Sequence, residues 1–144
     1  FQGRAELVAQ VIEARPDIMA HNMETVRRLS PQVRSAARYD TSLEVLRQIA
    51  GSGITCKSGI MVGLGETPQE VEELMDDLIA VGCQVLTIGQ YLQPSRRHWP
   101  VAEYVTPAQF ARYKETALAK GFRQVGSGPL VRSSYHAEQT ARRL

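Results

Sequence analysis

The chain has 144 residues, of which 43% are hydrophobic and 22% are charged, a composition typical of a globular protein large enough to bury one core. Its 17 basic and 15 acidic residues leave a net charge of +2. Because the two signs alternate along the chain, this balance argues against a nucleic acid or a membrane surface as the main partner. No apolar run approaches the roughly 18 residues that cross a bilayer.

The N-terminal segment begins at Phe1 and has neither the basic lead nor the apolar stretch of a signal peptide. The chain also does not begin with Met, and Phe1 opens directly into a helical pattern, so we expect a chain cut from something longer. Apolar residues recur on one helical face between residues 3 and 14, which predicts a helix ended by Pro16. A short strand is expected over 17–22, followed by a brief helix over 24–29 that the next Ser-Pro pair would stop.

The middle of the chain alternates between helical and strand patterns. Asp40 or Thr41 can cap a helix that ends before a Gly-Ser-Gly turn, and an apolar strand follows over 54–62. Residues 67–70, Thr-Pro-Gln-Glu, form a capping box with proline at the first helical position. The helix that they open precedes another apolar strand over 84–89. Such strand–helix–strand units indicate an α/β fold, in which we expect the three strands to lie side by side in a parallel sheet.

After these strands the pattern becomes more polar. Residues 93–100 form a loop of a kind that carries function more often than packing. Thr106 and Pro107 open a further helix that extends to Lys120, and 122–126 can form one more strand. The two cysteines of the chain are too few for a disulfide framework. We expect both to be reduced, buried thiols in a cytoplasmic protein.

Five segments, in this order along the chain, resemble signatures of the lipoyl synthases, a family of radical S-adenosylmethionine (SAM) enzymes. They are residues 1–4 (Phe-Gln-Gly-Arg), 21–25 (His-Asn-Met-Glu-Thr), 57–67 (Lys-Ser-Gly-Ile-Met-Val-Gly-Leu-Gly-Glu-Thr), 87–95 (Thr-Ile-Gly-Gln-Tyr-Leu-Gln-Pro-Ser) and 132–136 (Arg-Ser-Ser-Tyr-His). The Asn-x-Glu and the glycine-bearing strand are shared more widely among radical SAM enzymes, including relatives of biotin synthase. The stretches 90–95 and 132–135 are those that single out the lipoyl synthases.

The resemblance implies a fold as well. Radical SAM enzymes are (β/α)6 partial TIM barrels with parallel strands inside and helices outside, and this chain would supply the C-terminal half. Residues 1–92 would form the last β/α units of the barrel. Residues 93–144 would form a C-terminal extension that carries the Arg-Ser-Ser-Tyr segment.

The resemblance implies that five residues of this chain are candidates to bind SAM. By the resemblance, Asn22 and Glu24 would bond the ribose hydroxyls. The residues alone instead favour a pair that caps the helix expected at 24–29. Lys57 and Arg38, with Arg34 as a further candidate, would pair with the SAM carboxylate, because a buried carboxylate needs a cation. Solvation at the surface is the alternative for each arginine.

The glycine-bearing turn at residues 63–66, Gly-Leu-Gly-Glu, ends a predicted strand and opens a predicted helix. It resembles a phosphate-cradling turn but lacks the third glycine and the lysine of nucleotide motifs, so that signal is weak. Its glycines could instead let an adenine or methionine group approach the backbone closely. Glu66 could also be simply a charge at the helix terminus.

Ser133 is the candidate metal ligand and, with Arg132, the candidate catalytic residue. The resemblance implies that Ser133 ligates an auxiliary iron–sulfur cluster through oxygen, a weak bond that suits a cluster dismantled during sulfur donation. Arg132 would stabilise the alkoxide or organise the edge of the cluster. The local pattern alone favours Ser133 or Ser134 as the cap of a last helix over 135–143.

The function implied for the whole enzyme is insertion of two sulfur atoms at C6 and C8 of an octanoyl group carried by a lipoyl carrier domain. Two [4Fe-4S] clusters and SAM would be its cofactors. Because the chain has only Cys56 and Cys83, we expect it to bind no cluster alone, to be inactive without the N-terminal half, and to self-associate through the exposed sheet edge. Two alternatives are a non-catalytic half-barrel binding module and an enzyme of the biotin synthase type.

Overall fold

A computed structural model describes residues 5–14, 16–33 and 39–131 of the chain. Its elements follow in the order α1 (Ala5–Glu13), β1 (Ile18–Ala20), α2 (Ser30–Val33), α3 (Tyr39–Gly51), β2 (Thr55–Val62), α4 (Pro68–Ala80), β3 (Val85–Gln90), α5 (Pro107–Lys120) and β4 (Gln124–Ser127). Within these ranges, no helix is long and apolar enough to cross a membrane.

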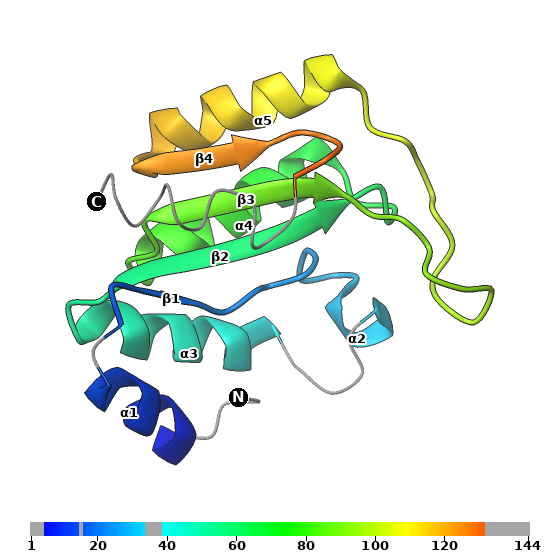
Figure 1. Cartoon of the computed structure of the whole chain (residues 1–144). Helices are drawn as coiled ribbons and strands as arrows, with labels where there is room; N and C mark the ends of the chain where they lie inside the picture. The colour runs from blue at the N-terminus through cyan, green and yellow to red at the C-terminus, as the bar shows by residue number, and fades with distance from the viewer. Residues whose placement is uncertain (1–4, 15, 34–38, 132–144) are drawn as a thin grey trace.

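The four strands form one parallel sheet in the order β1-β2-β3-β4 (Figure 1). The helices α3, α4 and α5 each connect two neighbouring strands. The predicted α/β fold is therefore confirmed, and so is the side-by-side arrangement of the first three strands. The strand expected at 122–126 is β4, which pairs with β3. The division of the chain between residues 92 and 93 stays a prediction.

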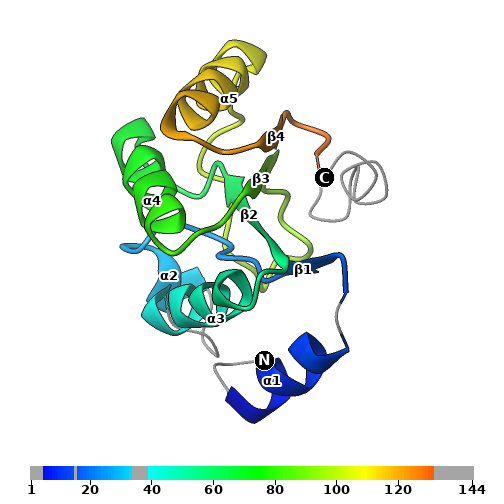
Figure 2. The same ribbon diagram turned by 90° about the vertical axis from the view of Figure 1, so that its left-hand side faces the viewer.

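The helices α3, α4 and α5 pack on one face of the sheet, and the opposite face carries none of these three (Figure 2). Large apolar side chains from each helix are almost completely buried there, including Leu46 of α3, Leu74 of α4 and Phe110 of α5. Burying one such side chain stabilises the fold by about 1.5–3 kcal/mol. One face of the sheet is thus buried under helices. The opposite face is the one on which we expect a binding site.

The capping box predicted at the start of α4 is present. Thr67 Oγ1 accepts the Glu70 N–H at 3.2 Å, and Glu70 Oε1 accepts the Thr67 N–H at 2.9 Å. Pro68 occupies the first helical position, where its missing N–H has no partner to lose. The same Thr-Pro signal opens α5 at Thr106.

The helix predicted over residues 24–29 is wrong. This segment instead follows the edge of β2, because Met61 N donates to Glu24 O at 2.9 Å and Glu24 N donates to Gly59 O. The chain then turns and begins the helix α2 at Ser30, the residue expected to stop one. Pro31 therefore opens a helix rather than ending one.

Candidate functional site

A pocket of about 230 Å³ lies over the carboxyl-terminal halves of β2 and β3 and beside the segment that follows β1. Its lining includes Asn22, Glu24, Gly59 and Thr87. The carboxyl ends of parallel strands are where α/β sheets and barrels bind ligands. The sequence predicted two of these lining residues, Asn22 and Glu24, as members of a binding site.

The strand β2 separates its side chains between the two faces of the sheet. Cys56 Sγ lies 3.6 Å from Leu46 O of α3, so Cys56 faces the helices. Because side chains alternate along a strand, Lys57 and Gly59 face the opposite side. Lys57, the candidate SAM-binding residue of β2, therefore shares a face with the pocket.

Glu24 has an unusual backbone conformation, with a φ of 72°. The left-handed region is costly for a residue with a side chain and recurs at binding sites, where neighbouring contacts maintain it. Here the hydrogen bonds of Glu24 with β2 hold the backbone in place. The capping role considered for Asn22 and Glu24 is wrong, because no helix begins at this segment, and both side chains line the pocket.

Gly59 permits a close approach inside the pocket. A Cβ atom at this position would lie 2.6 Å from Thr87 Oγ1 and 3.0 Å from Asn22 Oδ1. Both distances are shorter than ordinary van der Waals contact, so any larger residue would displace the polar groups around it. The glycine thus lets the strand backbone itself form one wall of the site.

The turn at residues 63–66 does not offer its amide groups to a phosphate. Glu66 is 92% buried, and its Oε1 accepts the N–H groups of Gly63 and Leu64 at 3.0 and 2.9 Å. Burial raises the pKa of the Glu66 carboxyl, while these backbone N–H groups act in the opposite direction. The carboxylate occupies the position that an external anion would take, so Glu66 is an internal anchor of the turn rather than a surface charge.

A second set of contacts, which the sequence did not predict, ties residues 91–105 to the rim of the pocket. We call this segment the strap. Gln90 Nε2 donates to Glu103 O at 2.9 Å and Gln90 Oε1 accepts the Val105 N–H at 2.9 Å. Trp99 Nε1 donates to Leu64 O at 3.1 Å. A Cβ at Gly63 would collide with Gln90 Nε2 and Glu103 O, and the φ of +98° at Gly63 also favours glycine.

Lys57 is buried, with a relative exposure of 2%. Burial lowers the pKa of its ammonium group. This ammonium group has no hydrogen bond or ion pair among the residues that the structure describes. Lys57 precedes Gly59 by two residues in β2, so it lies on the same face of the sheet. It is not part of the pocket lining. Lys57 is therefore a buried cation on the pocket face of the sheet.

The remaining predicted site residues, Arg38, Arg132 and Ser133, lie outside the described residues. The alternative in which Ser133 caps a helix over 135–143 lies there as well. The last described residue, Val131, lines the pocket.

The two cysteines do not fit an iron–sulfur cluster. Cys56 and Cys83 are free and buried on the helix side of the sheet, as expected for structural thiols. The contact with Cys83 and burial together raise the pKa of the Cys56 thiol, which disfavours the thiolate that iron requires. No group of three potential metal ligands occurs in the described part of the chain.

The sequence matches a protein-family model and several curated proteins. The model described as the Radical SAM superfamily matches residues 2–78. A lipoyl synthase of Bacteroides fragilis is 76% identical over 99% of this chain, and that of Bacteroides thetaiotaomicron is 74% identical over 99%. The lipoyl synthase of Treponema denticola is 63% identical over 96%. The chain spans about half the length of these relatives, 49%, 50% and 48% respectively.

Solved structures share the fold at low sequence identity. Streptococcus suis SuiB superposes with a TM-score of 0.67 and 12% identity, over 85% of this chain and 29% of that protein. A domain of the pyruvate-formate lyase-activating enzyme from Bacteroides vulgatus has a TM-score of 0.66 and 10% identity, over 86% of this chain and 75% of that domain. These likenesses support a partial barrel of parallel strands.

Proposed function

The chain belongs to the radical SAM superfamily, and from that membership we propose that it is part of a lipoyl synthase. The whole protein would insert two sulfur atoms at C6 and C8 of an octanoyl group attached to a lipoyl carrier domain. The observation that carries this proposal is the 76% identity with a lipoyl synthase over 99% of the chain. The pocket of about 230 Å³ beside Asn22 and Glu24 supports it.

The pocket residues fit part of SAM. Glu24 and Asn22 present a carboxylate and an amide to one space, and such groups bond neighbouring hydroxyls of a ribose. Gly59 leaves room for the ligand to contact the strand backbone. SAM would supply the radical chemistry that removes hydrogen atoms from the octanoyl chain.

Cations would neutralise the carboxylate of SAM. Lys57 faces the same side of the sheet as the pocket and is buried without a described partner, so a bound carboxylate would offset the cost of burying its charge. Arg38 is the second candidate for this role. The two would hold the methionine end of the ligand while Asn22 and Glu24 hold the ribose.

Iron–sulfur chemistry would require residues beyond those described. The whole enzyme would carry two [4Fe-4S] clusters, and Ser133 would supply an oxygen ligand to one of them, with Arg132 beside it. Because Cys56 and Cys83 do not fit a cluster, the cysteines would come from a part of the protein that this chain lacks. The isolated chain would then be inactive and would need the N-terminal half as a partner.

The test uses the complete protein with reconstituted clusters, SAM, a reductant and an octanoylated carrier domain. Mass spectrometry of the carrier should show two sulfur atoms gained, and Asn22→Ala should abolish the gain while the clusters remain spectroscopically intact. An unmodified carrier with an active reductant would contradict the proposal. Sulfur insertion into a free small molecule, but not into the carrier, would favour the biotin synthase type instead.

A further inference from the structure

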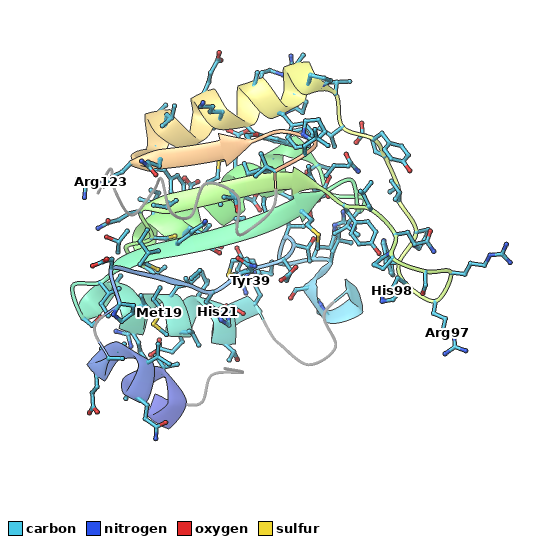
Figure 3. The ribbon with its side chains drawn as sticks, in the orientation of Figure 1. Met19, His21, Tyr39, Arg97, His98 and Arg123 are labelled. Atoms are coloured by element: carbon cyan, nitrogen blue, oxygen red, sulfur yellow. The ribbon has the colours of Figure 1, made fainter. Side chains whose placement is uncertain are left out.

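Near its middle the strap has an exposed basic tip, formed by Arg96, Arg97 and His98. Figure 3 labels Arg97 and His98. Arg97 points away from the body of the molecule in this view. The strap contains a single carboxylate, Glu103, against these cations. Arg27, Arg28, Arg47 and Lys120 are paired with carboxylates, whereas the two arginines of the tip make no ion pair with any described residue.

The basic tip is a fixed structure rather than a loose loop. Ser95 Oγ lies 2.8 Å from His98 Nδ1 and accepts the Arg97 N–H at 3.2 Å, which closes the turn. Tyr91 Oη donates to Trp99 O at 2.6 Å, directly after the tip. Surfaces held in place before binding lose less entropy when a partner docks. The hydrogen bonds of the strap therefore preorganise its cations.

The first residues of the strap adjoin the pocket. Leu92, at the start of the strap, lines the pocket and is 51% exposed. Tyr104, at the end of the strap, is 71% exposed. Exposed aromatic and apolar residues next to arginines are typical of protein interfaces. A partner seated on the strap would thus lie next to the pocket opening.

We propose that the strap is the docking surface for the carrier domain, and that Arg96 and Arg97 bind acidic residues on that domain. This inference rests on the proposed function, because a substrate attached to a protein must bring that protein to the rim of the pocket. The tip is better suited to a protein partner than to a nucleic acid. The chain has a net charge of only +2, and two arginines alone would bind a phosphate backbone weakly. The contact steers the acidic domain and fixes its orientation.

The experiment measures binding of a fluorescently labelled carrier domain to the complete protein by anisotropy at low salt. The double variant Arg96→Glu/Arg97→Glu should bind at least tenfold more weakly. The matched control Arg112→Glu/Lys114→Glu changes the same number of charges at exposed positions of α5 and should bind within twofold of the wild type. Arg96→Gln/Arg97→Gln should give an intermediate affinity, and equal thermal unfolding of all variants excludes misfolding.

Three outcomes would overturn the inference. They are equal weakening by the strap and α5 variants, no binding of the carrier to the wild-type protein, and displacement of the carrier by a single-stranded oligonucleotide that binds more tightly. Docking should be the same for octanoylated and unmodified carrier, because the tip contacts the domain and not the acyl group. Failure of the proposed function would show differently, since docking would persist while the protein neither bound SAM nor modified the carrier.

Discussion

At the scale of single residues, Glu24 combines backbone strain with a side chain in the pocket. Its φ of 72° is a conformation that glycine adopts at little cost, so Glu24→Gly should raise the free energy of unfolding by about 1 kcal/mol. Loss of the carboxylate should at the same time weaken SAM binding by about tenfold or more. Chemical unfolding and calorimetric titration of the complete protein would measure the two effects.

Glu24→Gln is the control for this prediction, because it removes the charge and leaves the backbone strain. It should weaken SAM binding without raising stability. If Glu24→Gly is less stable than the wild type, the left-handed conformation is not a source of strain and its functional interpretation fails.

Gly59 gives a second prediction at this scale. Gly59→Ala would place a Cβ 2.6 Å from Thr87 Oγ1, so we expect loss of SAM binding together with a destabilisation of about 1–3 kcal/mol. Gly51→Ala is the matched control, because nothing lies within 4 Å of the new Cβ at the end of α3. It should be neutral or slightly stabilising. Equal unfolding midpoints for the two variants would contradict the close approach at Gly59.

At the scale of elements, the salt bridge between Arg28 and Glu70 joins the 24–29 segment to the start of α4. Arg28 Nε donates to Glu70 Oε2 at 2.8 Å, and this bond lowers the pKa of Glu70 to about 2. A lowered pKa stabilises the fold above the ordinary value of 4.5, and this stabilisation is lost as the pH falls toward 2.

Glu70→Gln should remove this pH dependence. We expect the stability advantage of the wild type to shrink by about 1 kcal/mol between pH 5 and pH 2, a small value because Arg28 is 56% exposed. Glutamine can still complete the capping box, so α4 should remain. Glu72→Gln removes an exposed charge from the same helix. The pH profile of urea unfolding for Glu72→Gln should match that of the wild type. If Glu70→Gln and Glu72→Gln gave the same profile, the role of the salt bridge would be contradicted.

The sequence predicted those elements whose signals are local. The capping box at 67–70, the Thr-Pro start of α5 and the apolar strands are encoded within a few residues, and the structure confirms them. The segment 24–29 also has a local helical pattern, but hydrogen bonds to β2 at Gly59 and Met61 determine its path. No pattern near residue 24 could reveal those bonds.

The site divides in the same way. Asn22 and Glu24 could be identified because they form a short motif, whereas the role of Gln90 depends on partners 13 and 15 residues away. The signal available in the sequence was a glutamine at the end of an apolar strand. Such a side chain becomes buried, as Gln90 is here, and must then find hydrogen-bond partners. The burial of Glu66 depends likewise on how the turn closes, which its sequence pattern leaves open.

At the scale of the whole molecule, the sheet has one helix-covered face and two edge strands in its described part, β1 and β4. His21 N donates to Lys57 O, so the alternate N–H of Ala20 points away from β2. An edge strand with free N–H and C=O groups is a template for pairing with another chain. We therefore propose that the 144-residue chain self-associates in solution, with β1 as the contact.

Light scattering behind a sizing column should show a species heavier than the 16.0 kDa of one chain at micromolar concentration. Ala20→Pro removes the outward N–H and should shift the chain toward 16.0 kDa, whereas Ala20→Gly keeps that N–H and should remain associated. If the wild-type chain is monodisperse at 16.0 kDa at every concentration, the edge of β1 is not a contact. In the complete protein, Ala20→Pro should lower the stability of the fold, because a neighbouring strand of the barrel would accept a hydrogen bond from the same N–H group.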